Sequence, residues 1–141
     1  MAIKISWADV RDAKELATLD KAAHEEDRFW KVQSKSKFED LIRKSKFLTL
    51  VARKDGDAIA YLQSDTRNTR THLWVENVFV REEFRRQRIA KSLMEKFIGH
   101  WRGKVDYIVL LTPDEKVDIF KRLGFEKKMS YMVHRHSKRQ R

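Results

Sequence analysis

The stretch that decides the fold runs from residue 73 to residue 101 and reads LWVENVFVREEFRRQRIAKSLMEKFIGHW. Its first eight residues are apolar on both alternating faces apart from Glu76 and Asn77, which is typical of a central strand covered on both sides. Apolar residues then recur every four positions and predict an amphipathic helix: Ile89, Leu93, Phe97 and Trp101. A buried strand therefore leads through an arginine-rich loop straight into a helix.

The segments on either side of this stretch extend the pattern to the rest of the chain. Before it, the apolar runs 47–52 and 58–62 flank an Asp-Gly turn, which predicts a hairpin, and two amphipathic helices and a first strand precede them. After it, we expect a strand at 107–111, a helix that stops at Gly124, and a last strand from Phe125 to about His134. The predicted fold class is α+β: a mixed central sheet, antiparallel in its first half and parallel between strands four and five, flanked by about four helices.

Composition bounds the class of protein. The chain has 141 residues, 41% of them hydrophobic, and no cysteine, which excludes disulfides, thiolate nucleophiles and cysteine–zinc sites. No apolar run is long enough for a membrane span or a secretion signal, so we expect a cytoplasmic protein without membrane contact. With 4 Gly, 1 Pro and no linker, residues 1–134 are predicted to form one domain and 135–141 a basic tail. No metal is expected, because His134 and His136 lack a third ligand.

The charge balance points to a polyanionic partner. The chain has 32 Lys and Arg residues and 21 Asp and Glu residues, which gives a formal net charge of +11. Such a balance attracts nucleic acid, an anionic membrane or a phosphate-bearing cofactor, and does not choose among them. The loop 81–88 ends at a helix start, where unpaired backbone N–H groups bind phosphate. A solvated charged loop is the plainer alternative, and the strand-to-helix placement favours an anion site.

The stretch 75–90 resembles the acetyl-CoA motif of the GNAT superfamily of N-acetyltransferases. The family pattern is Arg/Gln-x-x-Gly-x-Gly/Ala, and Arg85 and Ala90 match its two ends. Residues 123–125, Leu-Gly-Phe, match the end of the family's second motif, and the order of elements agrees from residue 3 to residue 134. Two positions depart from the pattern: Arg88 replaces the middle glycine, and Phe120 stands where many members carry a tyrosine that protonates the departing thiolate.

The resemblance implies a function and a set of site residues. The activity would be transfer of an acetyl group from acetyl-CoA to a primary amine (a polyamine, a lysine side chain or a protein N-terminus), directly within a ternary complex. Acetyl-CoA would contact the strand edge, the loop and the last helix: Val78, Phe79, Val80, Arg85, Arg86, Gln87, Arg88, Ile89, Ala90, Lys91 and Phe120. The acceptor would lie near Glu25, Glu26, Asp27, Trp30 and Asn77. Glu76 would be the base, as the matching glutamate is in the spermidine/spermine N-acetyltransferases, and Tyr131 a substitute acid.

The position of Glu76 in the predicted strand also favours a role as a general base, independently of the family resemblance. It was expected on the same face of the strand as Trp74 and Val78, where burial disfavours a charged carboxylate and suits a general base for an ammonium substrate. The alternative is a structural ion pair with a nearby Lys or Arg, and the residues alone leave the two comparable.

Two other functions compete with catalysis. One is a basic nucleic-acid-binding module that uses the loop arginines and the tail, with binding that weakens steeply with salt. The other is a degenerate GNAT domain that has lost its cofactor, which Arg88 and Phe120 suggest. Two partners are further expectations: a second copy in a homodimer, since GNAT enzymes are often dimers, and nearby nucleic acid reached through the basic tail.

Overall fold

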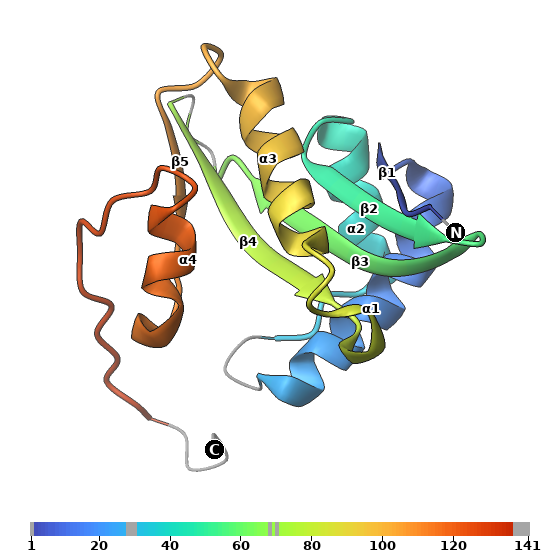
Figure 1. Cartoon of the computed structure of the whole chain (residues 1–141), viewed down its shortest axis with the longest axis horizontal. Coiled ribbons are helices and arrows are strands. Elements are labelled where there is room, and N and C mark those ends of the chain that lie inside the picture. Colours follow the sequence, from blue (N-terminus) through green and yellow to red (C-terminus); the bar gives the residue numbers. More distant parts are fainter. Residues whose placement is uncertain (1, 28–30, 68, 70, 137–141) are drawn as a thin grey trace.

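A computed structural model of the chain describes residues 2–27, 31–67, 69 and 71–136. Five strands form one sheet in the order β1-β2-β3-β4-β5, antiparallel as far as β4 and parallel between β4 and β5, so the predicted fold class is confirmed (Figure 1). The elements in chain order are β1 (Lys4–Trp7), α1 (Ala13–Glu26), α2 (Lys35–Lys44), β2 (Thr49–Lys54), β3 (Asp57–Asp65), β4 (His72–Val80), α3 (Ile89–Trp101), β5 (Tyr107–Leu110) and α4 (Val117–Lys121).

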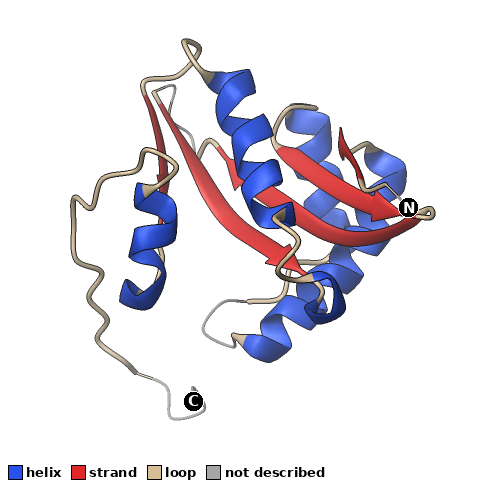
Figure 2. Ribbon diagram, viewed as in Figure 1, coloured by secondary structure: helices blue, strands red, loops and turns tan. Residues whose placement is uncertain are grey.

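The helices cover the sheet on both faces (Figure 2). On one face α3 packs its buried side chains, among them Leu93 and Phe97, against apolar residues of β2, β3 and β4. On the other face α1 and α2 pack Leu16 and Phe38 around the fully buried Tyr61 of β3. The strands between these layers are buried on both sides, as the continuous apolar runs predicted, and they give the site a rigid base.

The predicted hairpin is present between β2 and β3. Asp55 and Gly56 form its turn with φ values of 52° and 85°. Two consecutive left-handed residues are what the tight turn of a right-twisted hairpin requires, and Asp-Gly adopts them at little cost. The hairpin sets the register in which β3 then pairs with β4.

A β-bulge interrupts the pairing of β3 with β4. Gln63 pairs with Asn77 while the next residue, Ser64, pairs with Val75, so Glu76 is an extra residue on β4. The alternation of β4 shifts by one residue at this point. Leu73 and Val75 before the bulge, and Val78 and Val80 after it, all face α3. The expectation that Glu76 shares one face with Val78 is therefore wrong, because the simple two-residue period does not continue across a bulge, whereas Glu76 and Trp74 both contact Arg67.

The helix after β5, α4, ends at Lys121, and Gly124, the predicted stop, forms the cap that follows it. This glycine has a φ of 98°, and its N–H donates to Lys121 O at 3.0 Å while the N–H of Phe125 donates to Phe120 O at 3.1 Å. This is a Schellman cap, and its usual apolar contact is present, since the rings of Phe120 and Phe125 lie 6.0 Å apart, edge to face. The Leu-Gly-Phe sequence is thus the stop signal of α4.

The predicted last strand, residues 125–134, does not form. Residues 125–136 are irregular in the structure, and Met129 and Met132 are 89% and 88% exposed. A strand needs a neighbouring backbone to pair with, and this segment runs on the far side of α4 from the sheet (Figure 1). Residues 125–134 therefore have the alternating pattern of a strand but no neighbouring strand in the described structure with which to pair.

Of the helices in the described part of the chain, none has the length and apolar character that crossing a bilayer requires.

Candidate active site

β4 and β5 are the last two strands of the described sheet, and they stop pairing partway along β4, which leaves an open strand edge at the site. Their parallel pairing runs from His72 with Tyr107 to Val75 with Leu110 and stops there. β4 continues to Val80, and within the described chain it pairs over residues 77–80 with β3 alone (Figure 1). The other edge of this half of β4 therefore presents backbone N–H and C=O groups to an extended ligand that can add as a further strand.

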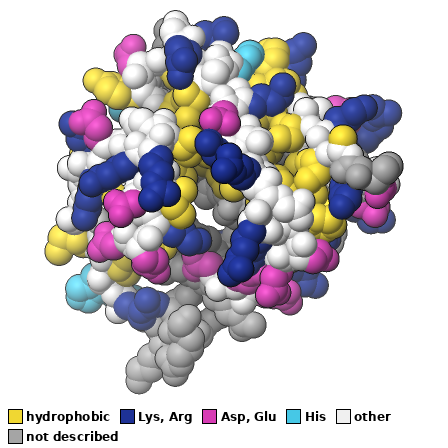
Figure 3. Space-filling model, in the orientation of Figure 1, with side chains coloured by type: hydrophobic (Ala, Val, Ile, Leu, Met, Phe, Trp, Pro, Cys, Tyr) yellow, Lys and Arg dark blue, Asp and Glu magenta, His cyan; other side chains and the backbone are white. Residues whose placement is uncertain are grey.

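The basic loop carries the chain from the end of β4 into α3. Arg86 and Arg88 both adopt left-handed backbone, with φ values of 68° and 61°. The first amide at the start of α3 with a recorded backbone acceptor is that of Ser92, which donates to Arg88 O at 3.0 Å. Amides of the first helical turn precede it and carry the positive end of the helix dipole, so this end of α3 could bind an anion. Lys and Arg side chains are spread over this side of the molecule, interleaved with acidic ones (Figure 3).

Arg88 stands where the family pattern has a glycine, and the loop keeps a left-handed backbone there. Arg88 takes the left-handed conformation itself, at a cost of about 1–2 kcal/mol for a residue with a Cβ. Its side chain is exposed, as are those of most of the predicted cofactor residues in this loop, Arg86, Gln87, Ala90 and Lys91, whereas Ile89 is buried in the core. The backbone path that the glycine would allow is thus retained.

The Arg85 side chain is exposed, and it already has partners within the protein. Its guanidinium donates to both carboxylate oxygens of Glu26 at 2.8 Å and to the carbonyl oxygen of Val80 at 2.8 Å, and it lies 5.5 Å from the centre of the Phe79 ring. Arg85 was predicted to contact the cofactor and Glu26 the acceptor. The structure brings these two predicted residues together as an ion pair.

A pocket of about 480 Å³ opens on the other side of the β4 edge, between α1, the segment before α2, and the ends of β3 and β4. Its floor is a hydrogen-bond network. The Tyr61 hydroxyl donates to Asp20 Oδ1 at 2.5 Å and accepts from Asn77 Nδ2 at 2.8 Å. The backbone N–H of Gln33 donates to Asp20 Oδ2 at 2.6 Å, and Gln33 and Gln63 bond through their amides. Burial first, and then the Asp20 carboxylate, raise the pKa of Tyr61, so its hydroxyl stays protonated.

Glu76 lines the same pocket and is held by Arg67. The guanidinium donates to both carboxylate oxygens, at 2.6 and 2.8 Å, and lies 4.1 Å from the centre of the Trp74 ring. The hydrogen bonds that Arg67 donates to Glu76 outweigh burial and raise the pKa of Arg67. Of the two interpretations of Glu76, the structure shows the ion pair. Each carboxylate oxygen still has a free lone pair, so the pair itself leaves room for another donor.

The remaining predicted residues are spread around this centre. Val78 and Phe79 line the pocket, and Phe120 is half-buried on α4. Glu25 and Glu26 close the last turn of α1 and Asp27 follows it, whereas Trp30 lies outside the described residues. Tyr131 is 55% exposed and close enough to contribute, as the smallest cause, to the raised pKa of Arg67.

Several residues of the site were not predicted from the sequence. One is Asp20, which lies within the apolar stripe of α1, and a charged residue in such a stripe is a signal of a buried polar contact. Tyr61 lies in an apolar run that predicted only a core strand. Arg67 follows β3 in a polar loop, and nothing in its neighbourhood indicated a bond to Glu76.

The site thus joins an anion-binding helix start to a polar pocket through one open strand edge, an arrangement suited to transferring a group between two substrates. Residues 45–127 match the family described as "Acetyltransferase (GNAT) domain". The match spans more than half of the chain, which therefore belongs to the GNAT acetyltransferase family. No curated protein matches the chain in sequence.

Solved structures with the same fold include enzymes with different acceptors. The ribosomal-protein-alanine N-acetyltransferase from Brucella melitensis biovar Abortus 2308 is 20% identical, with a TM-score of 0.69 over 96% of this chain and 100% of that chain. The glucosamine-6-phosphate N-acetyltransferase from Arabidopsis thaliana is 16% identical, with a TM-score of 0.74 over 97% and 100%. Aminoglycoside N-acetyltransferase AAC(6')-Iy in complex with CoA is 18% identical, with a TM-score of 0.71 over 96% and 95%. At these identities the likeness establishes the fold.

Proposed function

We propose that this protein is an N-acetyltransferase that moves an acetyl group from acetyl-CoA to a primary amine by direct transfer in a ternary complex. The observation that carries the proposal is the open edge of β4, which connects the start of α3 to the polar pocket. Membership of the GNAT family supports acetyl transfer, and the CoA complex of a protein with this fold supports the donor.

The proposal assigns residues of this chain to each part of acetyl-CoA. Backbone amides at the start of α3, with the side chains of Arg86, Gln87, Arg88 and Lys91 around them, would bind the pyrophosphate. The edge from Val78 to Val80 would hold the pantetheine arm through backbone hydrogen bonds, with Phe120 packing against it. Because Arg85 is bound to Glu26, it acts in this proposal by fixing the loop.

The chemistry is one substitution at the thioester carbonyl. The amine nitrogen forms a bond to the carbonyl carbon, the carbon–sulfur bond breaks, and the sulfur leaves with its electron pair. The amine loses a proton to Glu76 through a water, using a lone pair that Arg67 leaves free. Tyr131 supplies a proton to the departing sulfur. Backbone N–H groups of β4 polarise the carbonyl oxygen as charge develops on it.

Calorimetric titration with acetyl-CoA, at low and at high salt, tests donor binding. We expect one-to-one binding that persists at high salt, because backbone amides and an apolar arm contribute besides charge. Binding that disappears with salt contradicts the proposal and favours a general polyanion site. A screen of primary amines for thiol release then tests transfer, with the Glu76→Gln variant as the control for the base.

Three further expectations belong to this proposal. The protein would act in the cytoplasm and form a homodimer, and the basic tail 135–141 would guide it to an acceptor near nucleic acid. Acceptor kinetics that are insensitive to salt, and unchanged when the tail is deleted, would contradict the proposed role of the tail.

A further inference from the structure

The charges of the pocket indicate what kind of amine it takes. This inference rests on the proposed function, since it treats the pocket beside the β4 edge as the acceptor site. Four carboxylates line the pocket: Asp20, Asp27, Asp65 and Glu76. Asp20, Asp65 and Glu76 each have a described partner. They differ in whether that partner is a cation.

Two of these carboxylates are already neutralised. Glu76 is held by Arg67, and Asp65 bonds Lys44 Nζ at 2.9 Å. Although burial alone would raise it, the bond from Lys44 lowers the pKa of Asp65. Neither carboxylate therefore requires a positive charge from a substrate.

Asp20 is different, because it is buried without a cation. It is 4% exposed, and its recorded hydrogen bonds come from the hydroxyl of Tyr61 and the backbone N–H of Gln33, both neutral groups. Among the described residues no Lys or Arg lies within ion-pair distance of it. A buried charge without an opposite charge is costly, so a cation that enters the pocket gains more from Asp20 than from the paired carboxylates.

Three lysines from separate parts of the fold line the same pocket. Lys31 precedes α2, Lys37 lies in its first turn, and Lys116 precedes α4. In the described part of the chain, none of the three lies within ion-pair distance of a carboxylate, although Lys37 contributes weakly to the low pKa of Asp65. The pocket thus has a buried negative charge at its floor and unneutralised positive charge in its wall.

We propose that the acceptor is an amine that also carries an anionic group, a carboxylate or a phosphate, on the same small molecule. Its ammonium group lies toward Asp20 and its anionic group meets Lys37 and Lys116. An amine without an anionic group, such as a simple diamine, brings only positive charge to a wall that already carries three lysines. The pocket therefore selects against polyamines, the acceptor class that the acidic end of α1 first suggests.

The test uses pairs of amines that differ in the anionic group. The pairs are L-lysine and cadaverine, glucosamine 6-phosphate and glucosamine, and phosphoethanolamine and ethanolamine. Binding of each to the full chain with CoA present is measured by calorimetry, which does not depend on turnover. The variant is Lys37→Gln with Lys116→Gln, and the matched control is Lys96→Gln, an exposed lysine of α3 that does not line the pocket.

We expect the anionic member of at least one pair to bind about tenfold more tightly than its partner. The double variant should lose most of that preference and the Lys96→Gln control should keep it. Equal affinities within every pair, tighter binding of the members without an anion, or no binding of any member at millimolar concentration overturns the inference. So does a preference that survives the double variant.

The same samples separate this inference from the proposed function. If acetyl-CoA is consumed with cadaverine and with L-lysine at equal efficiency, the acetyltransferase proposal stands and the inference fails. If the anionic members bind selectively and no amine releases thiol from acetyl-CoA, the pocket preference stands and the proposed transfer fails.

Discussion

Arg85 Nη2 lies 2.8 Å from both carboxylate oxygens of Glu26, a residue 59 positions earlier in the chain. Arg85 lies in the basic loop between β4 and α3, and Glu26 is the last residue of α1, so this ion pair connects the loop to a helix that lines the pocket. It also neutralises one of the loop's arginines. The loop therefore attracts an anion less strongly than its sequence of arginines suggests.

Glu26→Gln is expected to tighten acetyl-CoA binding at low salt. The substitution leaves the charge of Arg85 uncompensated next to the loop, and an exposed pair of this kind corresponds to a change of about 1.5- to 5-fold. Calorimetry at two salt concentrations measures it. Glu95→Gln on α3 changes the net charge equally without breaking the pair, so an equal gain in both variants contradicts the role of the ion pair.

Arg88→Gly is expected to leave the protein as stable as before or to stabilise it by up to about 1 kcal/mol. Glycine removes the penalty of the left-handed conformation at φ 61° and loses more entropy on folding, and the two effects partly cancel. Arg81→Gly is the matched control, because Arg81 has a φ of −56° and gains no such relief. Urea denaturation compares them, and an equal loss in both variants shows that Arg88 is not strained.

Glu76→Gln is expected to lower kcat by about 100-fold or more at neutral pH, the usual contribution of a general base. The deficit should shrink as the pH rises toward the pKa of the amine, because the acceptor then arrives without its proton. A pH profile of kcat/KM for both proteins measures this. A deficit that is constant across the profile would indicate that Glu76 only holds Arg67 in place.

Tyr61→Phe is expected to lower the free energy of unfolding by about 1–3 kcal/mol. The hydroxyl bonds both Asp20 and Asn77 at the floor of the pocket, and its removal leaves two polar groups short of a partner. Tyr107→Phe on β5 is the control, since Tyr107 is 60% exposed and should change stability by less than about 0.5 kcal/mol. Similar losses in both variants contradict the network's role.

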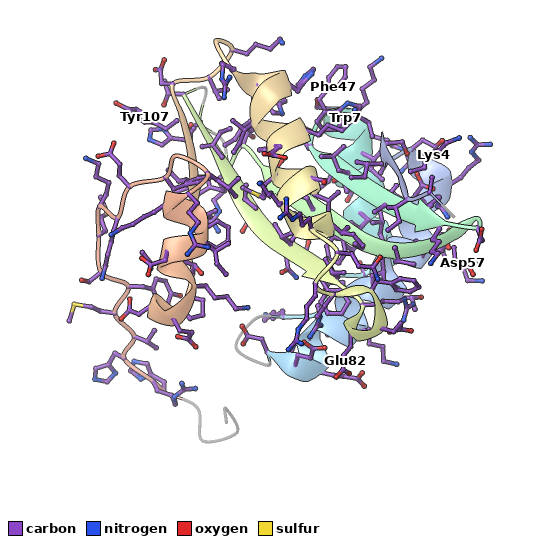
Figure 4. The ribbon with its side chains drawn as sticks, in the orientation of Figure 1. Lys4, Trp7, Phe47, Asp57, Glu82 and Tyr107 are labelled. Atoms are coloured by element: carbon purple, nitrogen blue, oxygen red, sulfur yellow. The ribbon has the colours of Figure 1, made fainter. Side chains whose placement is uncertain are left out.

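His100 is expected to make the protein less stable as the pH falls from 7.5 to 5.5. Its ring stacks on Phe47 with centroids 4.1 Å apart, beside Trp7, which Figure 4 shows next to Phe47. Burial first, and then Lys104 and Lys96, lower the pKa of His100. In the unfolded chain His100 has the ordinary histidine pKa of about 6.5. As the pH falls through that value, the unfolded chain binds more protons than the folded chain, and the free energy of unfolding decreases. Thermal melts measure this loss, and His100→Phe should make it smaller.

Most of the fold could be predicted because its signals are local. The four-residue period of α3, the Asp-Gly turn and the glycine after α4 each report a structure that neighbouring residues build themselves. The last strand was predicted from the same kind of signal and is absent, because a strand also needs a partner edge, and the alternation of residues 125–134 carries no information about one.

The part of the site that could be predicted is the part formed by residues contiguous in the sequence. The loop and the start of α3 are continuous in sequence, and they lie where the family motif placed them. The network of Asp20 and Tyr61 joins residues 41 positions apart, and its partners each looked like ordinary members of their own elements. The bulge at Glu76 depends on how β3 and β4 pair, which the alternation within β4 alone does not show.

The bulge in β4 also makes the carboxylate of Glu76 separable from the packing of the strand. Glu76 is the surplus residue, so a chain that lacked it would keep Leu73, Val75, Val78 and Val80 in unbroken alternation on the α3 side. The packing of β4 on α3 therefore does not require a residue at this position. Deletion of Glu76 would remove the carboxylate and leave the same apolar residues of β4 facing α3.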